Sequence, residues 1–99
     1  MFELVFTQSA RAELETLDGD HSKRGVVKQI KKSLGYLQHK PRHPSLKTHV
    51  YRSLEHPYHP TEKVFEAYVQ QHTPAAYRLF WCYGPTKGQI TIIAITPHP

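Results

Sequence analysis

The sequence predicts one α+β domain over residues 1–99, in the order β-α-α-β-β-β with room for a further strand. Apolar residues recur at helical spacing in the first forty residues and alternate with polar residues beyond residue 64. Pro41 and Pro44 separate the two halves, because proline cannot continue a helix. A chain of 99 residues holds one hydrophobic core. We therefore expect a two-helix hairpin packed on one face of a small, mainly antiparallel twisted sheet, with the other face open to solvent.

The first half reads as a strand followed by two helices. Residues 2–7 are rich in aromatic and β-branched side chains and predict a short strand. Thr7 or Ser9 can cap the first helix, and Gly19 ends it. Residues 20–22 offer a second cap, after which helical spacing continues through about residue 39. The two apolar stripes are Ala10, Leu14 and Leu17, then Val27, Ile30, Leu34 and Leu37.

The second half reads as strands. Residues 46–54 predict an irregular strand, and the prolines within 56–60 predict a loop. Alternation over 64–69 and 76–83 predicts two regular strands. Residues 90–96 are apolar on both faces, which is typical of a strand in the interior of a sheet. Tyr77, Leu79, Trp81 and Tyr83 share one face of their strand and are expected in the core under the helices.

Positive charge is concentrated in one part of the chain. The net charge is +5, yet residues 23–52 contain nine Lys and Arg and no carboxylate. Such a field attracts phosphates or an acidic protein partner. A solvated helix face that keeps the protein soluble is the alternative interpretation. The candidate RNA-binding residues are Lys23, Arg24, Lys28, Lys31, Lys32, Lys47 and Arg52.

Arg78 stands in the centre of an apolar strand, where burying it without a partner is costly. It should therefore point to the uncovered face of the sheet or meet a partner. Glu66 and Tyr68 are the polar residues on the outward face of the neighbouring predicted strand, and Lys47 and His49 line one side of the segment before it. A face with such charges and rings suits RNA binding. The alternative is an Arg78–Glu66 pair that only satisfies the sheet surface.

Other classes of protein are disfavoured. No apolar run approaches the roughly 18 residues of a membrane span, and the first residues do not read as a signal peptide. Cys82 is the one cysteine, which excludes an internal disulfide. The pairs His39/His43 and His56/His59 lack an evident third metal ligand. We expect a cytoplasmic protein without a metal or a cofactor and without a membrane partner.

These residues resemble the RelE/ParE-type toxin superfamily of bacterial toxin–antitoxin pairs over nearly the whole chain. The resemblance is carried by the order of the elements and by Pro-Ser-Leu-Lys at 44–47, Ala-Tyr-Arg-Leu-Phe-Trp at 76–81 and Ile-Thr-Ile-Ile-Ala-Ile at 90–95. The ending Pro97-His98-Pro99 is similar to the YoeB-like branch, in which a near-terminal histidine is catalytic. The resemblance implies a RelE-like fold and a ribosome-dependent endoribonuclease that cuts messenger RNA and is silenced by an antitoxin.

Individual roles follow from the same resemblance. Arg78 matches the arginine that acts on the scissile phosphate, His98 matches a general acid or base, and Lys47 would anchor the RNA backbone. The RelE branch has two lysines on the strand before the arginine, where this chain has Glu66 and Tyr68. Glu66 or His49 would then be the base and His98 the acid, and Tyr68 would stack on or orient a nucleobase.

Two alternatives stay open. A ParE-like toxin would bind DNA gyrase and perform no chemistry, and a lapsed toxin would survive as a binding protein. In each toxin reading the partner is a cognate antitoxin, in addition to the ribosome and messenger RNA or, alternatively, gyrase. Acidic segments of the antitoxin are expected along residues 23–32 or across the Arg78 face.

Overall fold

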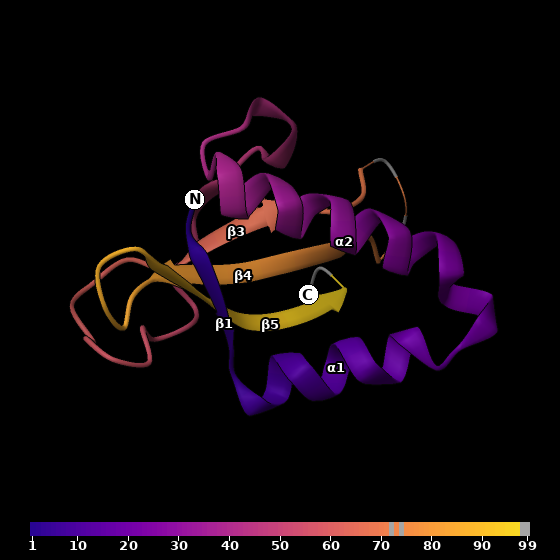
Figure 1. Cartoon of the computed structure of the whole chain (residues 1–99), viewed down its shortest axis with the longest axis horizontal. Helices are drawn as coiled ribbons and strands as arrows, with labels where there is room; N and C mark the ends of the chain where they lie inside the picture. Colours follow the sequence, from indigo (N-terminus) through magenta and orange to yellow (C-terminus); the bar gives the residue numbers. More distant parts are fainter. Residues whose placement is uncertain (72, 74, 98–99) are drawn as a thin grey trace.

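The computed structural model describes residues 1–71, 73 and 75–97, and within them it confirms the predicted α+β architecture (Figure 1). The helices are α1 (Gln8–Asp18) and α2 (Arg24–His39), with single-turn 3₁₀ helices η1 (His21–Lys23) and η2 (Pro44–Leu46). The strands are β1 (Glu3–Phe6), β2 (His49–Val50), β3 (Phe65–Tyr68), β4 (Tyr77–Tyr83) and β5 (Gln89–Pro97). The irregular strand expected over 46–54 is thus two residues long.

The described strands form one sheet in the order β1-β5-β4-β3-β2. Strand β1 runs parallel to β5, and the other neighbours are antiparallel. The fully apolar strand β5 has neighbours on both sides, as its sequence predicts. In this register Arg78 lies between Tyr68 of β3 and Thr96 of β5.

Capping residues place the helices as the sequence predicts. The Thr7 hydroxyl oxygen accepts a hydrogen bond from the Ala10 N–H at 3.0 Å and donates to the Ile93 carbonyl at 2.7 Å. This one side chain therefore starts α1 and ties it to β5. Gly19 ends α1, where its N–H donates to the Glu15 carbonyl. Asp20 caps η1 through the Ser22 N–H.

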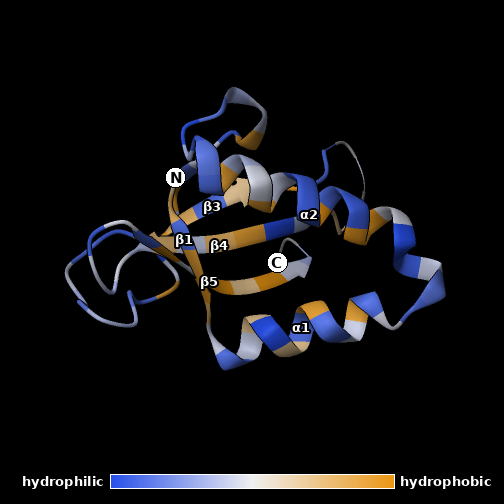
Figure 2. Ribbon diagram, in the orientation of Figure 1, coloured by the Kyte–Doolittle hydropathy of each residue, from blue (hydrophilic) through white to orange (hydrophobic). Residues whose placement is uncertain are grey.

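Both helices bury their apolar stripes on the same face of the sheet. Figure 2 shows the hydrophobic residues gathered on the strands and on one side of each helix. Burying a large aliphatic side chain contributes about 1.5–3 kcal/mol. The core cluster joins Ala10, Leu17, Val27, Ile30, Leu34 and Leu37 of the helices to Phe65, Ala67, Leu79 and Trp81 of β3 and β4. Tyr83, expected in this core, is instead 39% exposed because it lies at the end of β4.

The expectation that the opposite face of the sheet is open to solvent is wrong at one end. Residues 51–63, which connect β2 to β3, cover part of that face. The Tyr51 ring lies 4.7 Å from the ring of Phe80, and the Tyr58 hydroxyl is hydrogen-bonded to Thr91 at 3.0 Å. Phe80 and Thr91 are consequently buried although no helix covers them.

The predicted loop at 56–60 is anchored by a buried histidine. His56 accepts hydrogen bonds at Nδ1 from the N–H groups of Tyr58 and His59, at 3.1 and 3.0 Å. With Nδ1 acting as an acceptor, Nε2 carries the proton and donates to the Tyr83 carbonyl at 3.0 Å. His56 therefore fixes the loop to the end of β4.

Candidate functional site

Four of the predicted site residues gather on the sheet face away from the helices. His49 of β2 is directly opposite Glu66 of β3, and Tyr68 of β3 is directly opposite Arg78 of β4. In each strand, apolar residues alternate with these site residues. The apolar residues face the core and fix the position of the strand. The convergence is therefore a consequence of register across three neighbouring strands.

Glu66 and His49 form a hydrogen-bonded pair. The distance from His49 Nε2 to Glu66 Oε1 is 2.7 Å, and His49 Nδ1 lies 3.1 Å from the Lys47 carbonyl. Since a carbonyl only accepts, Nδ1 donates to it, and the proton of the pair lies between Nε2 and the carboxylate. The side chain of His49 is 46% exposed, whereas that of Glu66 is 2% exposed. The imidazole is thus the member of the pair that solvent can reach.

The main chain around Lys47 contributes to this geometry. Lys47 ends η2 in the left-handed conformation, with φ 46°. Such a conformation is uncommon for a residue with a Cβ atom. It places the Lys47 carbonyl within reach of His49 Nδ1, two residues further on. The Lys47 side chain itself is exposed.

Arg78 faces away from the helices, as predicted, but it is buried rather than extended into solvent. Its side chain is 10% exposed, and Nη1 donates to the carbonyls of Gln70 and Tyr77 at 2.7 and 3.1 Å. Nε lies 3.7 Å from Glu66 Oε2 and has no hydrogen-bond partner among the described residues. The guanidinium carbon sits 3.9 Å from the centre of the Tyr68 ring, in cation–π contact.

The buried charges support each other. One carboxylate oxygen of Glu66 lies 3.7 Å from Arg78 Nε, and the other lies 2.7 Å from His49 Nε2. Removing one member of a buried pair leaves the other charge uncompensated, which costs about 3–5 kcal/mol. The Arg78–Glu66 pair considered from the sequence is therefore present, and it forms part of a larger network that includes His49 and Tyr68.

Gln70 is a contributor that sequence reasoning missed. Its carbonyl accepts from Arg78, and its side-chain oxygen accepts from the Tyr77 N–H at 3.1 Å. The first of these contacts uses the main chain, so the residue type at position 70 carries no signal for it. The role predicted for His98 concerns a residue outside the described part of the chain.

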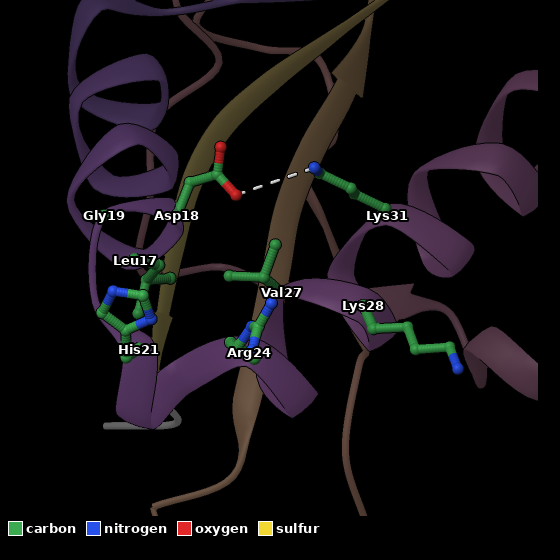
Figure 3. A pocket seen from close by; sticks show the side chains of 8 residues that line it. All are labelled: Leu17, Asp18, Gly19, His21, Arg24, Val27, Lys28 and Lys31. Atoms are coloured by element: carbon green, nitrogen blue, oxygen red, sulfur yellow. Dashed lines mark ion pairs between the residues drawn. The ribbon is translucent and has the colours of Figure 1, made fainter.

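Five of the candidate cations lie on the helical side of the molecule, where Lys32 lines a hollow together with Tyr68. Lys23, Arg24, Lys28, Lys31 and Lys32 belong to η1 and α2, which cover the opposite face of the sheet. The end of this helical hairpin contains a groove of about 530 Å³ (Figure 3). In it Lys31 pairs with Asp18 at 3.7 Å, with both side chains about 60% exposed, and Lys28 extends away from the pair. Arg52 is exposed in the segment after β2.

The described residues contain no cluster of metal ligands and no membrane-spanning helix, and Cys82 is buried. Within residues 1–71, 73 and 75–97, no three His, Cys, Asp or Glu side chains are arranged to hold a metal ion. Burial raises the pKa of the Cys82 thiol to about 11, so the thiol is protonated at neutral pH. Over the same residues, each helix is too short or too polar to cross a bilayer.

The fold is shared with small bacterial and archaeal toxins. A YoeB/ParE toxin from Agrobacterium tumefaciens superposes with a TM-score of 0.70 at 13% identity, covering 98% of this chain and 99% of the toxin. The YoeB dimer from Staphylococcus aureus gives 0.65 at 17% identity, with 99% and 98% covered. RelE in the RelE–RelB complex from Pyrococcus horikoshii OT3 gives 0.66 at 12% identity, with 97% and 93% covered.

These similarities define the class of fold to which the structure conforms. It is the α+β fold of the RelE/ParE toxin superfamily, as the sequence resemblance implies. Within that class, YoeB-type and RelE-type toxins are both similar over nearly the full chain. The sequence matches no protein-family model and no curated protein, so the likeness rests on the structure and concerns the fold.

Proposed function

We propose that this protein is the toxin of a toxin–antitoxin pair and cleaves messenger RNA on the ribosome without a metal ion. The observation that carries the proposal is the 2.7 Å contact between the half-exposed His49 and the buried Glu66, next to Arg78. An imidazole oriented by a carboxylate is a general acid–base device. Its place on the face away from the helices leaves the imidazole accessible to a polynucleotide.

The reaction in this proposal uses the RNA's own nucleophile. The 2′-hydroxyl loses its proton to a base and its oxygen bonds to the adjacent phosphorus, while the bond from phosphorus to the 5′-oxygen breaks. The leaving 5′-oxygen takes a proton from an acid, and the products are a cyclic phosphate and a 5′-hydroxyl. We assign the base to His49 because it is the exposed member of the pair. Both of its ring nitrogens are hydrogen-bonded in this structure, so the assignment requires the ring to leave the Lys47 carbonyl when RNA binds, with Nε2–H donating to Glu66 and Nδ1 taking the proton. The resemblance to the YoeB-like branch supports His98 as the acid.

The role of Arg78 changes in this version. The sequence resemblance implies direct contact with the phosphate, but Nη1 is already used by two main-chain carbonyls. We assign Arg78 to the electrostatic support of Glu66 and to stacking on Tyr68, with the phosphate approaching from the His49 side. Exposed cations such as Lys47 would then neutralise the RNA backbone.

An antitoxin is the partner that the proposal requires. The structurally similar RelE was crystallised with RelB, which supports a protein inhibitor for this chain as well. The acid-free stretch 23–52 favours an inhibitor with acidic segments.

The test compares two histidine variants after brief expression in bacterial cells. His49→Gln keeps a hydrogen-bonding group opposite Glu66 but cannot transfer a proton, and we expect cleavage to fall by about 10²–10⁴-fold. His39→Gln is the matched control, because it changes an exposed histidine at the end of α2. Primer extension on translated transcripts measures cleavage. Cleavage within codons that persists in His49→Gln would refute the assignment.

A gyrase-binding toxin is the second candidate. It is favoured by the enclosure of Arg78, which withdraws the guanidinium from direct contact with a phosphate. A DNA-damage response without any transcript cleavage, equal in wild type and in His49→Gln, would establish this candidate in place of the endoribonuclease.

A further inference from the structure

A second concave site lies at the other end of β4, where the anchored loop meets the β4–β5 turn. It encloses about 540 Å³. Its wall on one side is the loop held by His56, and on the other the turn after Tyr83. Glu66 is opposite Phe80, three positions before Tyr83 on β4, which is about 10 Å at the rise of a strand. Neither His49 nor Glu66 lines this pocket.

Tyr83 supplies an exposed but immobilised aromatic surface to the pocket. It is 39% exposed, while its ring packs against Trp81 at 5.0 Å, Phe2 at 5.8 Å and Phe65 at 6.0 Å. Aromatic neighbours at such distances hold a ring in one orientation. A planar ligand can stack on a ring of this kind without first ordering it.

Hydrogen-bond donors dominate the polar lining of the pocket. Lys63 and Lys87 are exposed on its two walls, with His59 beside the loop and the carboxylate of Glu62 as the acidic member. Two ammonium groups against one carboxylate favour an anionic ligand rich in acceptors. Together with the ring, this lining matches a planar base joined to a phosphate.

The pocket is preorganised. On the turn side, the Gly84 N–H donates to the Gln89 carbonyl at 2.9 Å, and the Thr86 hydroxyl donates to the Gln89 side chain at 2.7 Å. On the loop side, His56 makes the three hydrogen bonds described above. Walls that are ordered before binding reduce the entropy lost when a ligand enters.

We infer that this pocket binds a nucleotide of single-stranded RNA, with the base stacked on Tyr83 and the phosphate between Lys63 and Lys87. The inference rests on the proposed function in that it extends the RNA path away from the cleavage site. Stacking on an aromatic ring is tolerant of base identity, so the pocket contributes affinity without sequence preference.

The test measures binding of fluorescein-labelled hexauridylate to the full chain by anisotropy. Lys63→Gln/Lys87→Gln removes two charges from the pocket, and Arg11→Gln/Lys40→Gln removes two exposed charges outside the pocket as the matched control. We expect the pocket variant to bind at least about fivefold more weakly than the control, because the control loses only long-range attraction. Equal affinities for the two variants would overturn the inference.

The aromatic part is tested separately. Tyr83→Phe keeps the ring and should bind as wild type, whereas Tyr83→Ser should lose roughly 5- to 100-fold in affinity. If Tyr83→Ser fails to fold, photocrosslinking of 4-thiouridine-containing hexauridylate to the wild type replaces it. Adducts within residues 59–65 or 83–89 support the site, and adducts confined to α2 refute it. Full competition by uridine monophosphate at equal concentration would assign the pocket to free nucleotides and overturn the RNA path.

Two further outcomes are diagnostic. If Lys63→Gln/Lys87→Gln weakens binding of a glutamate-rich peptide but not of hexauridylate, the pocket belongs to a protein partner and the inference fails. If the wild type cleaves transcripts but Lys63→Gln/Lys87→Gln binds hexauridylate as tightly as the wild type, the pocket is refuted and the proposed function is kept. Pocket-dependent hexauridylate binding without any cleavage refutes the endoribonuclease and supports the pocket.

Discussion

The molecule has two charged regions that differ in kind. On the sheet face away from the helices, Arg78 and Glu66 are almost fully buried and form an ion pair, and Glu66 is also hydrogen-bonded to His49. On α2, the cations are exposed, and the Lys31–Asp18 pair is surrounded by solvent. The sequence alone does not distinguish the two regions, since both are rich in charged residues. Removing a charge should cost more free energy of unfolding in the first region, because water is excluded there and screens the charges of the second.

This difference separates two roles. The buried network sets the geometry of one imidazole, so its members cannot be exchanged one at a time. The charges on the helix surface are exposed, so we expect them to tolerate replacement. Candidate chemistry therefore belongs to the first region and long-range attraction to the second.

The largest expected effect is on stability at Arg78. Replacing Arg78 with Ala leaves Glu66 buried beside an empty volume, and we expect the free energy of unfolding to fall by about 3–5 kcal/mol. Lys31→Ala, the matched control on α2, should stay within about 0.5 kcal/mol of wild type. Urea denaturation measures both. Loss of activity in Arg78→Ala therefore has to be read together with its unfolding curve.

A double replacement sharpens the same comparison. Glu66→Leu/Arg78→Met removes both buried charges at similar volume, and it should recover much of the stability lost in Arg78→Ala. A double variant as unstable as Arg78→Ala would contradict the assignment of the cost to the stranded charge of Glu66.

The next effect concerns Cys82, on the same buried face as Arg78. Burial raises its pKa to about 11 from the usual 9.0, so at pH 8 the thiolate is about 100-fold scarcer than in the unfolded chain. Alkylation by iodoacetamide should be slower by at least that factor in the native protein. Because the folded pKa is raised, stability is retained below pH 9 and falls as the pH rises towards 11.

A cysteine on the helix surface supplies the contrast. Lys28→Cys in a Cys82→Ala background should be alkylated at close to the rate of the unfolded chain, as mass spectrometry of quenched samples would show. Equal native-state rates for position 28 and for Cys82 would contradict the burial of this face.

The smallest effect is expected for the pair in the helical groove. A double-mutant cycle on Lys31 and Asp18 should give a coupling of about 0.2–1 kcal/mol, because both side chains are largely exposed. High salt should abolish it. A coupling above about 2 kcal/mol that persists in 1 M salt would place this pair in the same class as the buried network.

The sequence predicts the elements better than the site. Thr7, Gly19 and the change of period at Pro41 act locally, so the helices and strands can be found without the fold. The convergence of Glu66 with Arg78 also follows from alternation. The enclosure of Arg78 does not, since it depends on the Gln70 carbonyl.

The loop explains a second difference. Residues 51–63 cover an end of the sheet because His56 satisfies two main-chain donors and one carbonyl at once. Nothing in the spacing of histidines and prolines distinguishes such an anchor from a solvated loop. The pocket beside Tyr83 depends on the same contact between the loop and the end of β4. Strand alternation carries no information about such a contact, so alternation alone places the Tyr83 ring in the core.

The parallel pairing of β1 with β5 has a consequence for how the chain is made. Glu3 aligns with Gln89, so β1 pairs with a strand that is synthesised more than eighty residues later. Until residues 89–97 have emerged from the ribosome, β1 has no neighbour and Arg78 lacks Thr96 on its flank. Vectorial synthesis therefore delays completion of the sheet around Arg78 until β5 is available to pair with both β1 and β4.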